Sequence, residues 1–120
     1  MSGFIIGRIK SIKYAVKGFF LLLTTENAII SQSVIALVFI GLGFYFEIGK
    51  MDWALQIMAI GLVLSIESLN TAVEKVCDFI HPEHHEKIGF IKDVASGAVT
   101  FAALTAFAIA TLIYGPILME

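Results

Sequence analysis

A row of polar side chains continues directly out of an apolar segment, where a membrane helix would leave the hydrocarbon. The row consists of Glu67, Asn70, Glu74 and Asp78, and the apolar segment before it covers residues 53–66. On a helix with about 100° per residue, the four side chains fall within about 80° of one another. Because ionisable groups are costly at a membrane boundary, this polar row indicates function.

Carboxylates along one helix face could transfer protons or hold a hard cation. Glu67 and Glu74 lie two helical turns apart, roughly 10 Å along the axis, which is too far for both to bind one ion easily. Two separate roles are therefore predicted. The deeper Glu67 would act as a general base, and Glu74 would hold the Mg²⁺ of a nucleotide, an ion that usually takes one or two carboxylates plus phosphates. The neighbouring Lys92 and Asp93 add a phosphate-directed cation near the start of a helix.

Composition indicates which elements must position these residues. Hydrophobic residues make up 58% of the 120-residue chain and charged residues only 15%, a balance that is rare in a soluble domain. We expect one membrane domain, residues 1–120, whose helices span the bilayer at residues 28–46, 53–76 and 94–114. Only 14 predominantly apolar residues of the second span precede Glu67, which must therefore lie near one interface or face a protected interior. Ten-residue alternating patterns are absent, which argues against a transmembrane barrel.

The distribution of basic residues predicts the orientation in the membrane. Seven of the eight lie before the first span or between the last turn of the second span and the start of the third. Because loops rich in Lys and Arg stay cytoplasmic, the N-terminus and the polar row are predicted to face the cytoplasm and the C-terminus the outside. The seven are Arg8, Lys10, Lys13, Lys17, Lys75, Lys87 and Lys92, and the eighth is Lys50.

Residues 4–23 have the pattern of an amphipathic helix that lies on an anionic leaflet. Lysines at helical spacing form a polar stripe, and isoleucine, valine and phenylalanine side chains supply apolar surface. The alternative is a basic flank that only sets topology. The stripe consists of Lys10, Lys13 and Lys17.

The second half of the chain predicts a helix end, a loop and a third span. Pro82 ends the second helix, and residues 81–91 form a polar connection before a span that begins near Asp93. This span carries small residues at i+4 spacing, which allow close helix contact in lipid. Three spans make a thin bundle with polar groups to hide, so we expect a homo-oligomer. The small residues are Ala98, Ala102, Ala106 and Ala110.

The connection holds His81, His84 and His85 beside Glu83, which leaves open a metal site or a hydrated loop with one functional histidine. Their spacing is not helical and favours the loop. Walker A, kinase catalytic-loop, dinucleotide-binding and nucleophile-elbow motifs are absent from the sequence. Any phosphoryl transfer by this chain must therefore use another scaffold.

The polar row belongs to a longer pattern, which reads Glu67-Ser-Leu-Asn70-Thr-Ala-Val-Glu74-Lys-Val-Cys-Asp78, then His85, then Lys92-Asp93-Val-Ala-Ser-Gly-Ala-Val. It closely resembles the signature of the prokaryotic diacylglycerol kinase family. That signature has an E-x-x-N-[ST]-A-[IV]-E-x-x-x-D core and a K-D-x-[AG]-[SA]-[GA]-A-V block at the same separation. The resemblance covers nearly the whole chain, including the basic surface helix and the three spans.

The resemblance implies an all-α homotrimer in the bacterial cytoplasmic membrane that moves the γ-phosphate of MgATP to a lipid hydroxyl at the cytoplasmic interface. In the family pattern, Glu67 matches the general base, and Asn70 matches a residue that orients the site. Glu26 and Glu74 match ligands of the nucleotide-bound Mg²⁺. The other nucleotide-site positions implied by the resemblance are Lys10, Tyr14, Lys17, Asp78, His85, Gly89, Lys92 and Asp93.

For the lipid acceptor, the resemblance favours diacylglycerol, which would give phosphatidic acid, and leaves undecaprenol as the alternative. Family members that phosphorylate diacylglycerol typically carry Gln where this chain has Ser31, and an Arg near Gly7, one place before Arg8 here. Undecaprenol kinases usually show an Asn followed by a His in the first span. This chain has Asn27 without that His, while its Asn-Thr-Ala core is similar to the undecaprenol branch.

Two hypotheses outside the kinases use the same polar row. A small proton-coupled transporter would have a lone carboxylate near the middle of a span, and usually four spans. A non-catalytic assembly factor would use Glu67 and Asn70 as hydrogen-bonding groups between helices. The clustering of carboxylates at a membrane boundary, followed by the Lys92–Asp93 pair, favours the lipid kinase over both.

Overall fold

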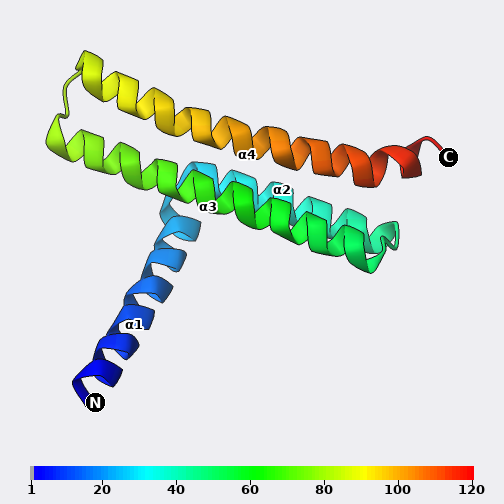
Figure 1. Ribbon diagram of the computed structural model, residues 1–120, viewed down its shortest axis with the longest axis horizontal. Helices are drawn as coiled ribbons and strands as arrows, with labels where there is room; N and C mark the ends of the chain where they lie inside the picture. Colours follow the sequence, from blue (N-terminus) through cyan, green and yellow to red (C-terminus); the bar gives the residue numbers. More distant parts are fainter. Residues whose placement is uncertain (1) are drawn as a thin grey trace.

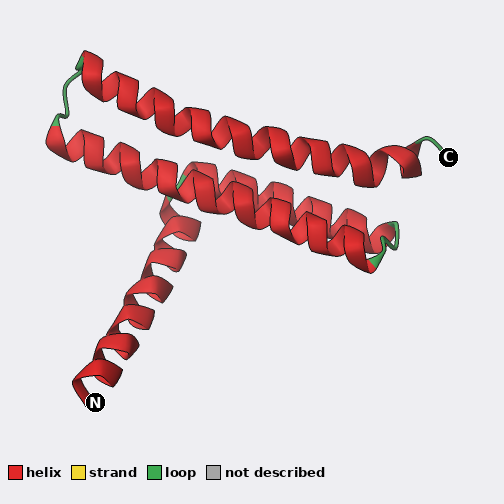
Figure 2. Ribbon diagram, in the orientation of Figure 1, coloured by secondary structure: helices red, strands yellow, loops and turns green. Residues whose placement is uncertain are grey.

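The computed structural model describes residues 2–120, which form four helices and no strand (Figure 1 and Figure 2). The helices are α1 (Ser2–Thr25), α2 (Asn27–Tyr45), α3 (Lys50–Ile80) and α4 (Glu86–Leu118). The last three are each long and apolar enough to cross a membrane. The predicted fold class, an all-α membrane protein with three spans after a first helix, is confirmed.

The first helix stands apart from the other three. α2, α3 and α4 lie side by side along their lengths, whereas α1 leaves the bundle where α2 begins (Figure 1). α1 has no buried residue, and most of its large apolar side chains are exposed. Exposed apolar surface on a helix outside the bundle suits a position in the membrane interface. The helix extends two residues beyond the predicted range 4–23 at each end.

α3 and α4 are longer than a bilayer requires. With 31 and 33 residues, they measure about 46 and 50 Å, against about 30 Å for the hydrocarbon core. Where they join each other, both extend past the junction of α1 and α2 (Figure 1). We call this the polar end, residues 26 and 67–93, and we call the opposite end, residues 39–56 and 109–117, the aromatic end.

The connection between α3 and α4 is shorter than predicted. α3 ends at Ile80, just before Pro82, as expected, but α4 already begins at Glu86, before the predicted start of the span near Asp93. The reason is local: His85 caps the helix, and its Nδ1 accepts the backbone N–H of Lys87 at 3.1 Å. A capped N-terminus lets the helix start in the polar segment outside the apolar stretch.

The aromatic end holds the best-packed part of the molecule. Ile48 and Tyr114 are buried there, and Phe39 and Trp53 pack against them. Gly43 of α2 lies so close to α3 that a Cβ at this position would come within 2.8 Å of the Trp53 ring. Only glycine therefore lets α2 and α3 meet at this distance.

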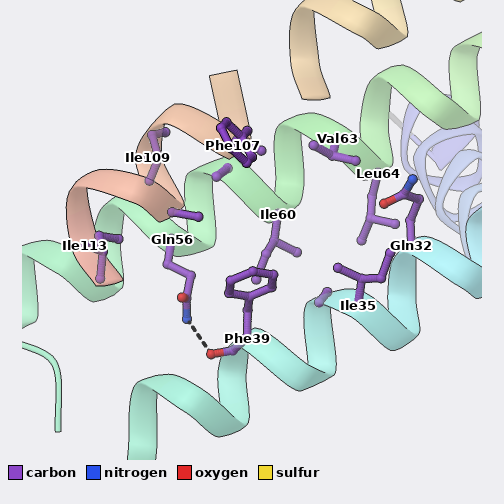
Figure 3. Close-up of a pocket in the computed structure, with 14 residues that line it drawn as sticks. Gln32, Ile35, Phe39, Gln56, Ile60, Val63, Leu64, Phe107, Ile109 and Ile113 are labelled. Atoms are coloured by element: carbon purple, nitrogen blue, oxygen red, sulfur yellow. Dashed lines mark hydrogen bonds between the residues drawn. The ribbon is translucent and has the colours of Figure 1, made fainter. Parts of the chain in front are cut away.

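A buried polar network joins three helices at the same end. The Gln56 amide of α3 donates to the backbone carbonyl of Phe39 in α2 at 3.2 Å (Figure 3). The Tyr114 hydroxyl of α4 donates to Gln56 Oε1 at 2.5 Å and lies 3.3 Å from the same carbonyl. Next to this network lies an apolar cavity of about 190 Å³, which residues of α2, α3 and α4 line. Hydrogen bonds between spans act as specific contacts where apolar burial gives no driving force.

The predicted ridge of small residues lies partly in the helix contacts. Ala102 is buried, with 3% of its surface exposed, while Ala106 and Ala110 are half-buried and line the cavity between α2, α3 and α4. Ala98, at the start of the ridge, is exposed within this single chain.

Candidate functional site

The first two residues of the polar row belong to a stripe of buried residues along α3. Glu67 and Asn70 are 9% and 8% exposed, and they continue the stripe begun by Ala59 and Val63. Thr71, which the sequence analysis did not single out, is buried beside them. Beyond Ala59 and Val63, this helix face thus becomes polar without becoming exposed. This change places a carboxylate on a largely buried helix face.

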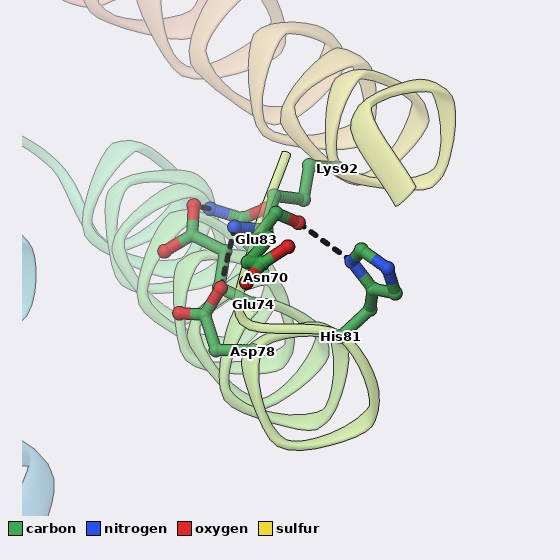
Figure 4. A network of polar contacts seen from close by, with 6 residues as sticks. All are labelled: Asn70, Glu74, Asp78, His81, Glu83 and Lys92. Atoms are coloured by element: carbon green, nitrogen blue, oxygen red, sulfur yellow. Dashed lines mark hydrogen bonds and ion pairs between the residues drawn. The ribbon is translucent and has the colours of Figure 1, made fainter. Parts of the chain in front are cut away.

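Asn70 is hydrogen-bonded on one side only. Its Nδ2 donates to Glu74 Oε1 at 3.2 Å (Figure 4), whereas its Oδ1 is buried without a partner among residues 2–120. Within the same residues, the Glu67 carboxylate makes neither a hydrogen bond nor an ion pair. The row therefore presents acceptor atoms that the chain itself leaves unsatisfied, and a donor from a ligand or another subunit could satisfy them.

An ion pair joins the start of α2 to this part of α3. Lys75 Nζ lies 3.0 Å from Glu26 Oε1, and Lys75 follows Glu74 directly. Glu26 is the N-cap residue of α2, but its side chain makes no capping hydrogen bond and reaches α3 instead. The pair brings two predicted metal ligands, Glu26 and Glu74, to the same region of the polar end.

A second ion pair joins α3 to α4 farther out. Lys92 Nζ lies 2.6 Å from Asp78 Oδ1 (Figure 4). Lys92 precedes the apolar stretch 94–114, and its hydrogen bond with the Asp78 carboxylate raises the pKa of the Lys92 ammonium above its usual value. Both side chains are well exposed, so the pair can open to bind an anionic ligand at little cost.

Several predicted nucleotide-site residues lie away from the row in a single chain. No hydrogen bond or ion pair within residues 2–120 joins Lys10, Tyr14 or Lys17 to α3, because α1 leaves the bundle (Figure 1). Asp93 is exposed on α4. Gly89 lies one turn into α4, where a Cβ would meet the His84 ring at 3.8 Å.

The oxygen atoms at the polar end fit a metal that arrives with a nucleotide better than a resident one. Residues 2–120 contain no group of three or more His, Cys, Asp or Glu side chains that could hold an ion alone. Mg²⁺ bound to phosphates needs only one or two carboxylates, which Glu26 and Glu74 can provide. In the connection, His81 Nδ1 lies 2.7 Å from the Glu83 carbonyl, and the His81 and His85 rings are 5.1 Å apart.

One feature near the row has no counterpart in the sequence analysis. Ser33 of α2 has a buried hydroxyl without a partner among residues 2–120, and it lines a cleft between α1, α2 and α3. Ser65 and Ser68 of α3 line the same cleft. No sequence pattern singles out Ser33, because Ser31, Gln32 and Ser33 are consecutive polar residues that lie on different faces of the helix.

Comparisons with known proteins agree with the pattern of the polar row. Residues 13–114 match the model of a family described as prokaryotic diacylglycerol kinase. The undecaprenol kinase of Bacillus subtilis is 33% identical over 107 residues, which cover 89% of this chain and 87% of that protein. The diacylglycerol kinase of Haemophilus influenzae is 36% identical over 94 residues, covering 78% and 80%. That of Escherichia coli K12 is 33% identical over 98 residues, covering 82% and 80%.

Proposed function

The chain belongs to the prokaryotic diacylglycerol kinase family and is therefore an ATP-dependent lipid kinase; from this premise we propose that it phosphorylates diacylglycerol to give phosphatidic acid. The observation that carries this proposal is the buried residue Glu67, whose carboxylate has no partner within residues 2–120 and shares a helix face with Glu74, two turns farther along α3 toward the two ion pairs. Family membership also decides against the transporter and assembly-factor hypotheses.

Glu67 is proposed to act as the general base. Its carboxylate would accept the proton of the lipid hydroxyl as that oxygen attacks the γ-phosphorus and the bond to ADP breaks. Burial on the stripe of α3 supports this role, because no cation of residues 2–120 competes for the carboxylate. The free Oδ1 of Asn70 is one turn away and would accept a hydrogen bond that holds the reacting groups in place.

The nucleotide is proposed to lie at the outer part of the polar end. Glu26 and Glu74 would hold the nucleotide's Mg²⁺, which neutralises phosphate charge during transfer. Lys92 would leave Asp78 to contact the phosphates, and the start of α4 would add backbone N–H groups to the same anion. The remaining proposed contacts are Lys10, Tyr14 and Lys17 of α1, with Asp78, His85, Gly89 and Asp93.

A homotrimer with its polar end in the bacterial cytoplasm is part of the proposal. In one chain, α1 lies away from the row and the polar row keeps unsatisfied acceptors, so a neighbouring copy could supply the missing contacts. The distribution of Lys and Arg supports the cytoplasmic orientation. Native mass spectrometry in detergent would test the subunit number, and labelling of Cys variants at both ends would test the orientation.

Undecaprenol is the second candidate for the acceptor. The observation in its favour is the similarity to the Bacillus subtilis undecaprenol kinase, which covers 89% of this chain. Both acceptors offer a primary hydroxyl to the same base, so the proposed mechanism is unchanged. They differ in the groups beyond the hydroxyl: diacylglycerol carries two ester carbonyls there, and undecaprenol carries an unsaturated hydrocarbon.

Phosphorylation by purified protein in mixed micelles tests the proposal. Diacylglycerol and undecaprenol are offered separately with MgATP, and the variant Glu67→Gln is compared with Glu47→Gln, the same substitution at the exposed α2–α3 turn. We expect product from diacylglycerol, loss of product with Glu67→Gln and normal product with Glu47→Gln. Product from undecaprenol alone would transfer the proposal to that acceptor, and product from neither lipid in a folded oligomer would contradict it.

A further inference from the structure

A cleft of about 180 Å³ lies in the corner where α1 leaves α2. Its walls come from the last turns of α1, the first turns of α2 and the middle of α3, so it lies just on the hydrocarbon side of the surface helix. The lining is apolar except for three serines, which lie on two different helices. The lining residues are Phe19, Leu22, Leu23, Ile29, Ser33, Leu64, Ser65 and Ser68.

Ser33 is the one hydroxyl residue within residues 2–120 whose oxygen is both buried and unpaired. Seven Ser and Thr hydroxyls donate to the carbonyl four residues earlier in their own helix, at 2.6 to 3.2 Å. The Ser33 Oγ is buried and has no partner among residues 2–120. Because an unpaired buried hydroxyl is costly, its hydrogen is available to an acceptor atom from outside this chain. The seven are Ser11, Thr24, Thr25, Ser68, Thr100, Thr105 and Thr111.

The cleft lies alongside the helix face that carries the proposed base. Ser68 follows Glu67 directly, and Leu64 lies one turn before it, so the α3 wall of the cleft is the helix face adjacent to that of Glu67, which does not itself line the cleft. Ser33 lies two turns into α2 from Glu26, deeper in the hydrocarbon. A lipid whose hydroxyl lies at Glu67 would therefore place its next polar atoms toward Ser33 and its chains toward the membrane.

We propose that Ser33 positions the acceptor by donating its hydroxyl hydrogen to an ester carbonyl of diacylglycerol, an inference that rests on the proposed function. A glycerolipid has a carbonyl oxygen a few bonds from its free hydroxyl, and the cleft that holds Ser33 is lined by α3 residues on either side of Glu67 in the sequence. Ser68 already donates to the Leu64 carbonyl at 2.7 Å, so its oxygen is left as an acceptor. An ether lipid keeps only the chain oxygen and lacks the carbonyl oxygen that projects from the chain, and a prenol has neither, so a donor placed for the carbonyl would favour the ester lipid over both.

Acceptors that differ only in the carbonyl test the assignment. The full-length protein is assayed in mixed micelles with MgATP and with dioctanoylglycerol, its ether analogue dioctylglycerol, or undecaprenol. Replacing Ser33 by Ala removes the donor, and Thr105→Ala is a matched control that removes a hydroxyl bonded within α4. Ser33→Ala should raise the KM for the ester lipid about 3- to 10-fold, and leave the KM values for the ether lipid and for ATP unchanged.

Each contrary result has a distinct meaning. An unchanged KM for the ester lipid, or an equal rise for the ester and the ether, would overturn the role of Ser33 in carbonyl recognition. A change in oligomer mass with Ser33→Ala would show that a second copy, not the lipid, accepts this hydrogen bond, and would also overturn the proposal. If wild-type protein phosphorylates undecaprenol but neither glycerolipid, the Ser33 assignment fails while the kinase stands. If it phosphorylates none of the three, the proposed function itself fails.

Discussion

The aromatic end and the polar end of the bundle differ in whether their buried polar groups are hydrogen-bonded. At the aromatic end, the Gln56 amide and the Tyr114 hydroxyl are buried and satisfy each other, with a Phe39 carbonyl completing the network. At the polar end, the Asn70 Oδ1 atom is equally buried but has no partner among residues 2–120. Both ends use the same stripe of α3, so the difference lies in the partners that α2 and α4 provide.

This difference indicates which end is built for stability and which for binding. A satisfied buried network rigidifies helix contacts, whereas unsatisfied acceptors raise the free energy of the empty state and are relieved by a ligand. The polar end also carries both ion pairs found within residues 2–120. Substitutions at the two ends should therefore have different effects. Those at the aromatic end should lower stability, and those at the polar end should lower activity.

The largest expected effect is on activity, from Glu67→Gln. The amide keeps the shape of the side chain but does not accept the proton, so kcat should fall about 10²- to 10⁴-fold. The thermal midpoint in detergent should stay the same or rise, because the carboxylate has no partner within residues 2–120 that the substitution could remove. A Glu67→Gln protein that unfolds more easily while retaining activity would reverse the comparison between the ends.

At the aromatic end, Gly43→Ala should give the largest loss of stability. The new methyl group would lie 2.8 Å from the Trp53 ring, which must then shift and separate α2 from α3. We expect a loss of about 1–3 kcal/mol in the free energy of unfolding, with lipid phosphorylation unchanged in the protein that remains folded. Gly41→Ala is the control, because no atom lies within 4 Å of a Cβ at that position.

Tyr114→Phe should have a smaller effect of the same kind. It deletes the hydroxyl that donates to Gln56 Oε1 and leaves that oxygen unpaired in a buried position. A loss of about 0.5–2 kcal/mol is expected, measured by denaturation in mixed micelles. Tyr45→Phe removes an exposed hydroxyl at the same end and should have no effect. Equal losses from the two substitutions would show that the network adds nothing.

The parts of this architecture that sequence predicts are those that depend on local pattern. Apolar runs fix the three spans, the lysine stripe at residues 10–17 indicates the surface helix, and the spacing of the polar row places it on one face. Pro82 ends α3 as expected because a proline in a helix removes a hydrogen bond by itself. The polar row was recognised because charges at a membrane boundary are costly whatever surrounds them.

The features that sequence does not predict depend on contacts between distant residues. Gln56 and Tyr114 are 58 positions apart, and nothing in either neighbourhood indicates that they meet. The early start of α4 depends on the conformation of His85 as a cap, which an imidazole rarely provides. The unpaired Ser33 hydroxyl is a property of three helices meeting at a corner, so only the assembled fold shows it.

The smallest stability effect is expected at the ion pair between Glu26 and Lys75, where a structural and a metal-binding role of the polar end give different results. Lys75 is 67% exposed, so Lys75→Gln should change the free energy of unfolding by less than about 1 kcal/mol. If Glu26 holds the nucleotide's Mg²⁺ as proposed, Glu26→Gln should raise the Mg²⁺ concentration needed for half-maximal activity, while Lys75→Gln should leave it unchanged or lower it, because the carboxylate is freed. An equal rise with both substitutions would show that the pair only joins α2 to α3, and that the polar end shares the structural role of the aromatic end.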